Sequence, residues 1–549
     1  MKLLFLQLPR LDHDVTSPGE NTMLAAACLT SALERSTESV HWEILPALRE
    51  QETGSDRILL EALEQMQPAV IAATCTLWNI ERTLDLLRQA RQQMPHLKVV
   101  LGGPEIVENH PLPLNRVADA LCIGEGEPHF PTILQHLRTA SRKNKPLIYR
   151  ACDAKPLRLA DALPPPDHPI NKPDAFGMAY LETNRGCPMK CAFCCYNLRR
   201  NVTTCLEPKE VAERIRILRK RGAKEIRLVD PTFNAHPDFE EMLKMMRREN
   251  RDKKIAFFVE IRADTLTEKQ AKLMAEAHIT EAEVGVQSTD PKVLKIIRRP
   301  LNEEKVFRGI EALLRHGIKP TVDFMYALPA QDAEDMKRSL AWLARFGEAI
   351  HPQFLPTLLL PGTELRDRAK ELKLRAQKLP PYRVLSTDRL TSSQLAMIEQ
   401  EAAELLGGFD SPTPRFVGRR LEGLFNPKGR TQGLKDPRTQ EQNRTTLYFD
   451  FTYETFPEII AAIKQAVARE PHILWQFVVT LDEEIPLDFI ESLITVIRGL
   501  PSHWLDRLIS PLDQPKLVAR RLFIRFTPAA TISAAWKAEA EDILRNAFH

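Results

Sequence analysis

Three cysteines follow one another closely on a short polar segment of the chain. Residues 185–197 read RGCPMKCAFCCYN, which separates Cys187, Cys191 and Cys194 by three and two residues. A loop of this length lets three thiolates surround one inorganic cluster, and cysteine thiolates are the ligands of a 4Fe-4S cluster. Three protein ligands leave one iron open, which is the arrangement needed to bind the amino and carboxylate groups of S-adenosylmethionine. The motif therefore predicts a cluster that delivers an electron to the sulfonium of that molecule.

Two other uses of such cysteines have to be weighed. Cysteines that act as small buried hydrophobes are not expected three at a time on one polar loop that contains Gly186 and Pro188. A structural zinc site normally takes four protein ligands, commonly from paired CxxC motifs. We keep both as alternatives to the cluster.

The stretches around this motif alternate between short apolar runs and amphipathic segments, from residue 178 to about residue 365. This rhythm predicts six strand–helix units and favours an open or partial (β/α)6 barrel. The functional end of a barrel is where its strands finish, and the cysteine loop directly follows the first expected strand. The six expected strands are Met178–Glu182, Glu225–Val229, Ile255–Ile261, Glu281–Gln287, Pro320–Tyr326 and Gln353–Leu359.

Residues 1–145 show a similar alternation of strand and helix patterns, which predicts a doubly wound parallel sheet. Ligands of such sheets lie beyond the carboxyl ends of the strands. Two of the loops expected there are rich in glycine, which lets the backbone approach a bulky ligand closely. The candidate binding residues on these loops are Thr74, Thr76, Trp78, Asn79, Gly102, Gly103, Pro104, Glu105, Gly124, Glu125, Gly126 and Glu127.

The cysteine loop on the first strand of a six-unit barrel resembles the radical S-adenosylmethionine (SAM) superfamily. We assign Cys194 rather than Cys195 as the third ligand, because Phe193 then occupies the aromatic position of the family. The resemblance implies a 4Fe-4S cluster and SAM as cofactors. It also implies cofactor contacts along successive strand ends: Asp230 and Thr232 near the methionyl part, Glu260 and Arg262 at the ribose and carboxylate, and Gln287 and Ser288 in the fourth-strand motif.

Two departures from the family pattern concern this predicted pocket. The usual Gly-Gly-Glu is absent near Asp230, and residues 326–329 read YALP where relatives often have Gly-Leu-Pro. Tyr326 and Asp323, near the end of the fifth strand, are our candidates for catalytic residues on position alone.

The first domain resembles the cobalamin-binding domain that is fused to one large branch of this superfamily. The resemblance implies cobalamin as a third cofactor, held by the strand-end loops. Residues 46–50 read PALRE and lack the cobalt-ligating histidine of the methionine-synthase type of domain, so we place Trp78 against the lower cobalt face. An ordinary core tryptophan is the alternative for Trp78. A nucleotide site is the alternative for the loops, although no GxGxxG opens the first helix.

Together the two resemblances imply a cobalamin-dependent radical SAM enzyme, and most directly a methyltransferase. It would move a methyl group from methylcobalamin to an unactivated carbon of a small-molecule or natural-product substrate, with electrons from an external reductant such as flavodoxin or ferredoxin. One alternative is a cyclase or rearrangement enzyme of the same kind without net methylation, and another is a non-catalytic cobalamin and Fe-S sensor. A methylthiotransferase is also considered, because Cys28, Cys75 and Cys122 are equally spaced.

We therefore expect an α/β protein of several domains. They are a Rossmann-like cobalamin-binding domain (1–145), a linker (146–177), a partial TIM-like barrel (178–365), a helical extension with a polar linker (366–445) and a small C-terminal α/β module (446–549). The helical segment and the C-terminal module match no motif that identifies a substrate.

Composition excludes several classes of partner. A net charge of +3, from 76 Lys and Arg against 73 Asp and Glu, gives no global attraction to nucleic acid or anionic membrane, so we expect neither as a partner. The apolar runs are shorter than the ~20 residues that span a bilayer, and we expect a cytoplasmic protein. All nine cysteines lie between Cys28 and Cys205, which indicates a local role for cysteine rather than disulfides throughout.

Overall fold

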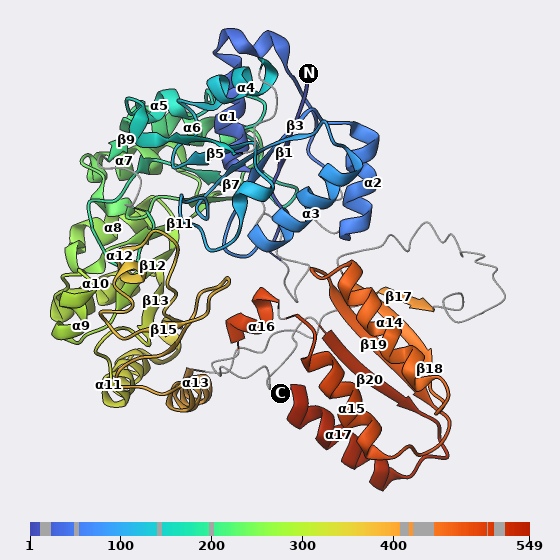
Figure 1. The fold of residues 1–549 in the computed structure, drawn as a ribbon. Helices are drawn as coiled ribbons and strands as arrows, with labels where there is room; N and C mark the ends of the chain where they lie inside the picture. The colour runs from blue at the N-terminus through green and yellow to red at the C-terminus, as the bar shows by residue number, and fades with distance from the viewer. Residues whose placement is uncertain are drawn as a thin grey trace.

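The computed structural model contains three α/β units in chain order, with an extension between the second and the third (Figure 1). It describes residues 1–10, 23–48, 54–139, 145–196, 203–406, 417–420, 444–501, 503–509 and 522–548. The polar stretch 426–445, which we expected to be a linker, lies outside the described residues up to residue 443, and its last two residues belong to a strand.

The first unit is a six-stranded parallel sheet with the order β2-β1-β3-β4-β5-β6. This order confirms the doubly wound fold and places its topological switch point between β1 and β3. The sheet runs past residue 145, where we expected the domain to end, because Leu147–Arg150 pairs with Ala120–Ile123. Its elements are β1 (Lys2–Leu6), α1 (Leu24–Glu34), β2 (Glu43–Ile44), α2 (Asp56–Met66), β3 (Val70–Thr74), α3 (Ile80–Gln93), β4 (Lys98–Gly102), β5 (Ala120–Ile123), α4 (Phe130–Thr139) and β6 (Leu147–Arg150).

Strand alternation explains why helices cover both faces of this sheet. Successive side chains of a strand point to opposite faces, so Leu4 and Leu6 of β1 pack in one cluster with leucines of α2 and α3. Leu3 and Phe5 pack in a second cluster with α1 and α4. Apolar residues on both faces of one strand are the pattern of a buried parallel sheet.

The second unit is an open parallel sheet with the order β14-β13-β12-β11-β10-β7, which confirms the six expected strands. Within the described residues, its edge strands β7 and β14 do not pair with each other. A two-stranded hairpin, β8 (Asn184–Arg185) with β9 (Thr204–Cys205), follows the first strand. The strands and helices are β7 (Met178–Leu181), α6 (Pro208–Lys220), β10 (Glu225–Leu228), α7 (Phe239–Glu249), β11 (Ala256–Ile261), α8 (Glu268–Glu276), β12 (Ile279–Gln287), α9 (Pro291–Ile296), α10 (Glu303–Arg315), β13 (Lys319–Tyr326), α11 (Ala333–Ala344) and β14 (His351–Pro356).

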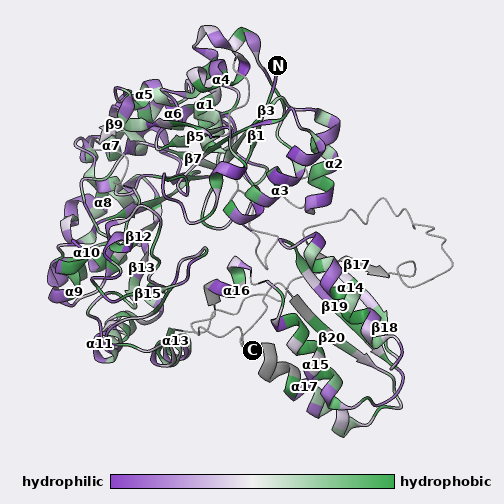
Figure 2. Cartoon of the chain, viewed as in Figure 1, coloured by the Kyte–Doolittle hydropathy of each residue, from purple (hydrophilic) through white to green (hydrophobic). Residues whose placement is uncertain are grey.

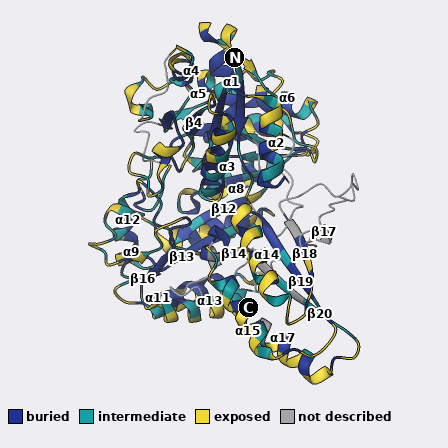
Figure 3. Cartoon of the chain, turned by 45° about the vertical axis from the view of Figure 1, so that its right-hand side comes forward, coloured by how far each residue is buried: buried dark blue, intermediate teal, exposed yellow. Residues whose placement is uncertain are grey.

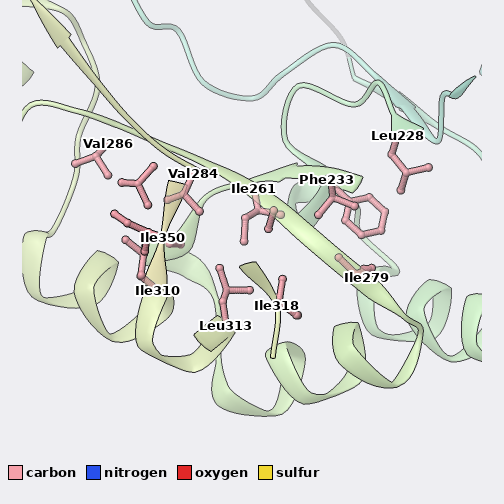
Figure 4. Close-up of a cluster of buried hydrophobic side chains, with 14 of the residues drawn as sticks. Leu228, Phe233, Ile261, Ile279, Val284, Val286, Ile310, Leu313, Ile318 and Ile350 are labelled. Carbon is pink, nitrogen blue, oxygen red and sulfur yellow. The ribbon is translucent and has the colours of Figure 1, made fainter. Parts of the chain in front are cut away.

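The core of this unit lies between the sheet and its covering helices. Figure 4 shows Val284 and Ile261 of the sheet directed toward Ile310 of α10. Along β12 the buried residues alternate with partly exposed ones, and the latter include Glu283 and Gln287. Alternation therefore turns the polar side chains of the strands to the inner side of the open barrel, where a site can form.

The extension differs from the mainly helical segment that we expected. A short antiparallel hairpin separates its helices: α12 (Glu364–Asp367), β15 (Arg375–Ala376), β16 (Val384–Ser386) and α13 (Ser392–Leu406). Backbone hydrogen bonds join it to the chain after β14, from Leu359 to Tyr382 and from Val384 to Thr357. The free edge after β14 explains the hairpin, because an unpaired strand edge offers backbone groups to another segment.

The third unit is a small parallel sheet with the order β17-β18-β19-β20, as expected for an α/β module. It begins earlier than residue 446, because Val417–Arg420 pairs with β18. Its elements are β17 (Val417–Arg420), β18 (Arg444–Asp450), α14 (Phe456–Arg469), β19 (Leu474–Leu481), α15 (Leu487–Arg498), α16 (Trp504–Ile509), β20 (Leu522–Pro528) and α17 (Ala534–Phe548).

Hydropathy follows this layering throughout the described chain. Purple hydrophilic residues lie on the outer sides of the helices in Figure 2, while the strands of the first two units are largely buried in Figure 3. None of the helices within the described ranges is long and apolar enough to cross a membrane.

Gly309 of α10 tests how closely the barrel helices pack on the loops that carry predicted site residues. A Cβ at this position would lie 2.1 Å from the backbone oxygen of Ala263, the neighbour of Arg262. Gly309→Ala must therefore displace α10, and we expect a loss of about 1–3 kcal/mol in the free energy of unfolding. Chemical denaturation measures it, with Gly499→Ala as the control, because the nearest atom there is 3.4 Å away. Equal stability of the two variants would contradict this close packing.

Candidate active site

The cysteine loop is anchored by one buried carboxylate. Asp230, which follows β10, accepts hydrogen bonds from the backbone nitrogens of Thr183 at 2.7 Å and Asn184 at 3.0 Å, and from the Thr183 hydroxyl. Asp230 is 0% exposed, and this burial raises its pKa to about 7. The residue thus fixes the chain between β7 and the cysteines, while its predicted contact with the methionyl part of SAM stays a prediction.

The three predicted cluster ligands occupy one loop and take contacts from different elements. Cys187 Sγ lies 3.4 Å from the hydroxyl of Thr232, and Cys191 Sγ accepts from the Arg299 guanidinium at 3.6 Å. Cys194 Sγ accepts from the backbone nitrogen of Tyr196 at 3.5 Å. The backbone nitrogen of Ala192 donates to the oxygen of Ile297 at the end of α9, and the oxygen of Ala192 accepts from the nitrogen of Leu365 in α12. These two hydrogen bonds hold the loop between the two helices.

The chemistry of these thiols fits an iron–sulfur cluster. None of the nine cysteines, all of which lie within the described ranges, forms a disulfide, so disulfides do not consume the donors. Burial, reinforced by the neighbouring thiols of Cys195, Cys191 and Cys187, raises the pKa of Cys194 to about 12. Bound iron supplies the positive charge that such thiolates need. Within the described chain, no three His, Cys, Asp or Glu side chains lie close enough together to hold one metal ion. An iron–sulfur cluster does not require this, because each of its thiolates binds a different iron.

Carboxyl groups from neighbouring strands line the inner side of the barrel. Glu260 of β11 is paired in register with Glu283 of β12, and Asp323 of β13 lies beside Glu283. Burial raises the pKa of Glu260 to about 7, and burial together with Glu283 raises the pKa of Asp323 far above its usual value. The Arg299 guanidinium, whose charge opposes this rise in the pKa of Asp323, donates to the backbone oxygen of Gly285.

Arg262 presents an unused donor at this end of the barrel. Its guanidinium donates to Asp264 at 2.9 Å and to the backbone oxygen of Pro300 at 2.6 Å. The buried Nη1 has no hydrogen-bond partner among the described residues. A buried orphan donor of this kind fits an anionic ligand group, in agreement with the carboxylate contact that the family resemblance implies.

The other residues predicted to contact SAM already have some contacts within the protein. Thr232 donates to the Pro231 oxygen at 2.6 Å, and Ser288 accepts from the backbone of Asp290 at 3.1 Å. Phe193 packs against two apolar clusters, and Gln287 has a backbone φ of 71° at the end of β12. Their contacts to a cofactor stay predictions.

Tyr326, a catalytic candidate, is tied to the extension. Its hydroxyl donates to Glu399 at 2.5 Å and accepts from Arg383 at 3.0 Å, and its ring stacks on Phe354. These bonds join β13 to α13. The structure therefore gives Tyr326 a connecting role, and its catalytic assignment stays a prediction.

In the first unit, the neighbouring residues Asn79 and Trp78 differ in burial. Asn79 is 1% exposed, accepts from Thr76 and donates to the backbone oxygens of Leu8 and Thr74, which ties the ends of β1 and β3 together. Trp78 is 39% exposed, so it is not the core tryptophan of the alternative interpretation. Thr76 leaves its buried hydroxyl without a partner among the described residues. An exposed ring beside an orphan hydroxyl fits a ligand that covers this strand end.

The loop after β4 lies directly on the end of β3. Gly103 has φ +100°, and a Cβ there would be 2.5 Å from the Cys75 oxygen, so a residue without a side chain is required. Pro104 is exposed at the tip. Glu105 is buried and accepts from Tyr382 of the extension at 2.9 Å, with His110 at 3.1 Å. Glu105 thus contacts the second half of the chain, a partner that the sequence did not reveal.

The loop after β5, with Gly124 at φ +87° and Gly126, also meets the second unit. Arg185, two residues before Cys187, donates to Glu127 at 2.8 Å and to Glu125 at 3.5 Å. The two regions that we expected to hold different cofactors are therefore in direct contact. Sequence reasoning missed Arg185, Tyr382 and Glu283. Only for Glu283 was there a signal, because the strand alternation of β12 places it on the same face as the predicted contact Gln287.

The remaining cysteines of the first unit do not form a second site. Cys28, Cys75 and Cys122 are 3%, 0% and 6% exposed and pack among apolar side chains. A cavity of about 260 Å³ lies elsewhere, between α1 and β7, and none of the predicted site residues lines it.

Comparison with known proteins agrees with both halves of this site. Residues 181–343 match the radical SAM superfamily, and residues 14–134 match the B12 binding domain. The cofactors of these two families are a 4Fe-4S cluster with SAM, and cobalamin.

Similar proteins include methyltransferases. An uncharacterised methyltransferase of Pyrococcus horikoshii is 24% identical over 347 residues, which cover 60% of this chain and 74% of that protein. The cobalamin-dependent radical SAM methyltransferase TokK of Streptomyces tokunonensis is 24% identical over 31% of this chain and only 28% of its own length. The fold resembles that of the radical SAM methyltransferase TsrM of Kitasatospora setae, with a TM-score of 0.53 and 15% identity over 67% of this chain and 76% of that one.

The hydroxyl of Tyr382 tests the contact between the extension and the loop after β4. Tyr382→Phe keeps the ring and removes one hydrogen bond to the buried Glu105, so we expect a loss of about 1–3 kcal/mol in stability. Thermal denaturation measures the change. Tyr453→Phe, at a ring that is 48% exposed, is the matched control. If both variants melt at the wild-type temperature, the contact contributes nothing to stability.

Proposed function

Because the chain belongs to the cobalamin-dependent radical SAM enzymes, we propose that it is a methyltransferase that moves a methyl group from cobalamin to an unactivated carbon of a small-molecule substrate. The observation that carries the proposal is the contact of the cysteine loop with the B12-binding unit, through Arg185 and Glu127 at 2.8 Å. Two cofactor regions held in contact suit a reaction in which both act on one substrate. The two methyltransferase relatives support the same reaction class.

The chain's own residues provide binding, orientation and exclusion of water. When bound, the cluster and SAM supply the oxidant that removes a hydrogen atom from carbon, and cobalamin supplies the methyl group. Cys187, Cys191 and Cys194 would hold the cluster, and the orphan Nη1 of Arg262 would take a carboxylate of SAM. On the other side of the site, Trp78 offers an exposed apolar ring against cobalamin.

The carboxyl groups inside the barrel would act mainly as hydrogen-bonding groups. With its raised pKa, Asp323 holds its proton at neutral pH and can donate toward Glu283. Glu260, with a pKa of about 7, exists in both forms at that pH. The inner side therefore carries less negative charge than three carboxylates would.

We also propose that electrons come from an external reductant such as flavodoxin or ferredoxin.

Metal analysis tests the cofactor residues directly. We expect about four iron and one cobalt per chain in protein prepared anaerobically with cobalamin, because one such cluster holds four iron. The Cys187/Cys191/Cys194→Ala triple variant should lose iron and keep cobalt. Cys152→Ala, at an exposed cysteine outside the loop, should keep both. Iron in the triple variant at the wild-type level would refute the ligand assignment.

Product analysis tests the reaction class. Reduced wild-type enzyme, given SAM with a labelled methyl group and a small-molecule extract, should transfer the label to a product, and the triple cysteine variant should not. A new product that lacks the label would instead indicate the cyclase or rearrangement reaction. Binding of both cofactors without SAM cleavage under reduction would indicate a sensor.

A further inference from the structure

Arg185 is surrounded by carboxylates from both units. Its Nε and Nη2 donate to the two oxygens of Glu182, both at 2.8 Å, while Nη1 donates to Glu127 at 2.8 Å and to Glu125 at 3.5 Å. Only 16% of the Arg185 side chain is exposed, and Glu127 is 7% exposed. The planar guanidinium thus joins the end of β7 to the loop after β5.

The guanidinium group matches the arrangement of these carboxylates. A guanidinium offers donors along several edges of one plane, so it can pair with Glu182 bidentately and still reach Glu127. Burial by itself lowers the pKa of Arg185, but Glu127 and Glu182 together raise it above its usual value, so the group stays charged. Loss of this cation would leave three carboxylates close together with little access to water, which is strongly unfavourable.

The position of Arg185 in the chain connects this contact to the cysteine loop. Arg185 precedes Cys187 by two residues on the short strand β8, and its backbone pairs with Thr204 of β9. Glu127 closes the loop that holds Gly124 and Gly126. Further side-chain contacts between the units involve different elements; among them, Tyr382 reaches Glu105 after β4, and Arg507 reaches Glu81 of α3.

We propose that Arg185 is a positioning residue that fixes the cysteine loop against the loop Gly124–Glu127 and thereby sets the distance between the cluster and cobalamin. The inference rests on the proposed function, in which both cofactors serve one site. It adds that one side chain, which need not touch either cofactor, fixes the cysteine loop against the loop after β5.

Electron paramagnetic resonance tests this role without a substrate. In reduced protein loaded with both cofactors, the cluster and cob(II)alamin are each paramagnetic, and their magnetic interaction depends on their separation. We expect the wild type to show this interaction and Arg185→Gln to lose it, although both metals load. Arg185→Lys should restore it only in part, because lysine keeps the charge without the fork. Arg150→Gln, which removes a surface arginine paired with Glu108, should match the wild type.

Glu127→Gln provides a second approach, because it keeps the pair of Arg185 with Glu182 and leaves fewer buried charges unpaired. We expect Glu127→Gln to weaken the magnetic interaction as Arg185→Gln does. If Arg185→Gln fails to fold, the Glu127→Gln variant alone tests the positioning role. An unchanged interaction in Glu127→Gln, or in a folded Arg185→Gln, would overturn the positioning role. If the wild-type protein binds no cobalt after loading with cobalamin, the proposed function itself is overturned. The cobalt content of the wild type is measured before any variant is compared.

Discussion

Buried carboxylates at the contact of two parallel sheets are the constraint on which the site depends. Glu127 and Glu182 come from different units, and each would repel the other without a cation between them. Arg185 supplies that cation and is part of the segment that carries the cluster cysteines. The electrostatic requirement of the contact and the placement of the cysteine loop are therefore met by one side chain.

The extension after the barrel acts as a second connection between the units. Its hairpin bonds to the chain after β14 through the backbone of Tyr382 and Val384. This pairing directs the buried ring of Tyr382 to Glu105, and the Arg366 guanidinium lies over the same ring at 4.7 Å. Two loops of the B12-binding unit are thus each held by a residue of the other half of the chain, which limits their independent movement.

Backbone geometry determines where the chemistry can take place. Both sheets are parallel, so all of their strand-end loops gather at one edge of each sheet. Asp230 fixes the start of the cysteine loop and Asn79 fixes the ends of β1 and β3. These two residues were predicted to contact cofactors, and the structure shows that their side chains bond to the backbone of the loops.

The sequence alone determined the local features of this protein. The spacing of Cys187, Cys191 and Cys194 and the alternation of residues in the strands predicted the cysteine loop, both larger sheets and the edges at which their strand-end loops gather, because these patterns depend on neighbours only a few residues apart. The boundary at residue 145 and the helical extension were predicted less well, because β6 and the hairpin β15–β16 form by pairing with distant strands. Only the tertiary structure decided the bond of Arg185 to Glu127 and of Tyr382 to Glu105, residues 58 and 277 positions apart. No periodicity of the chain encodes such contacts, since they arise where two independently patterned units pack together.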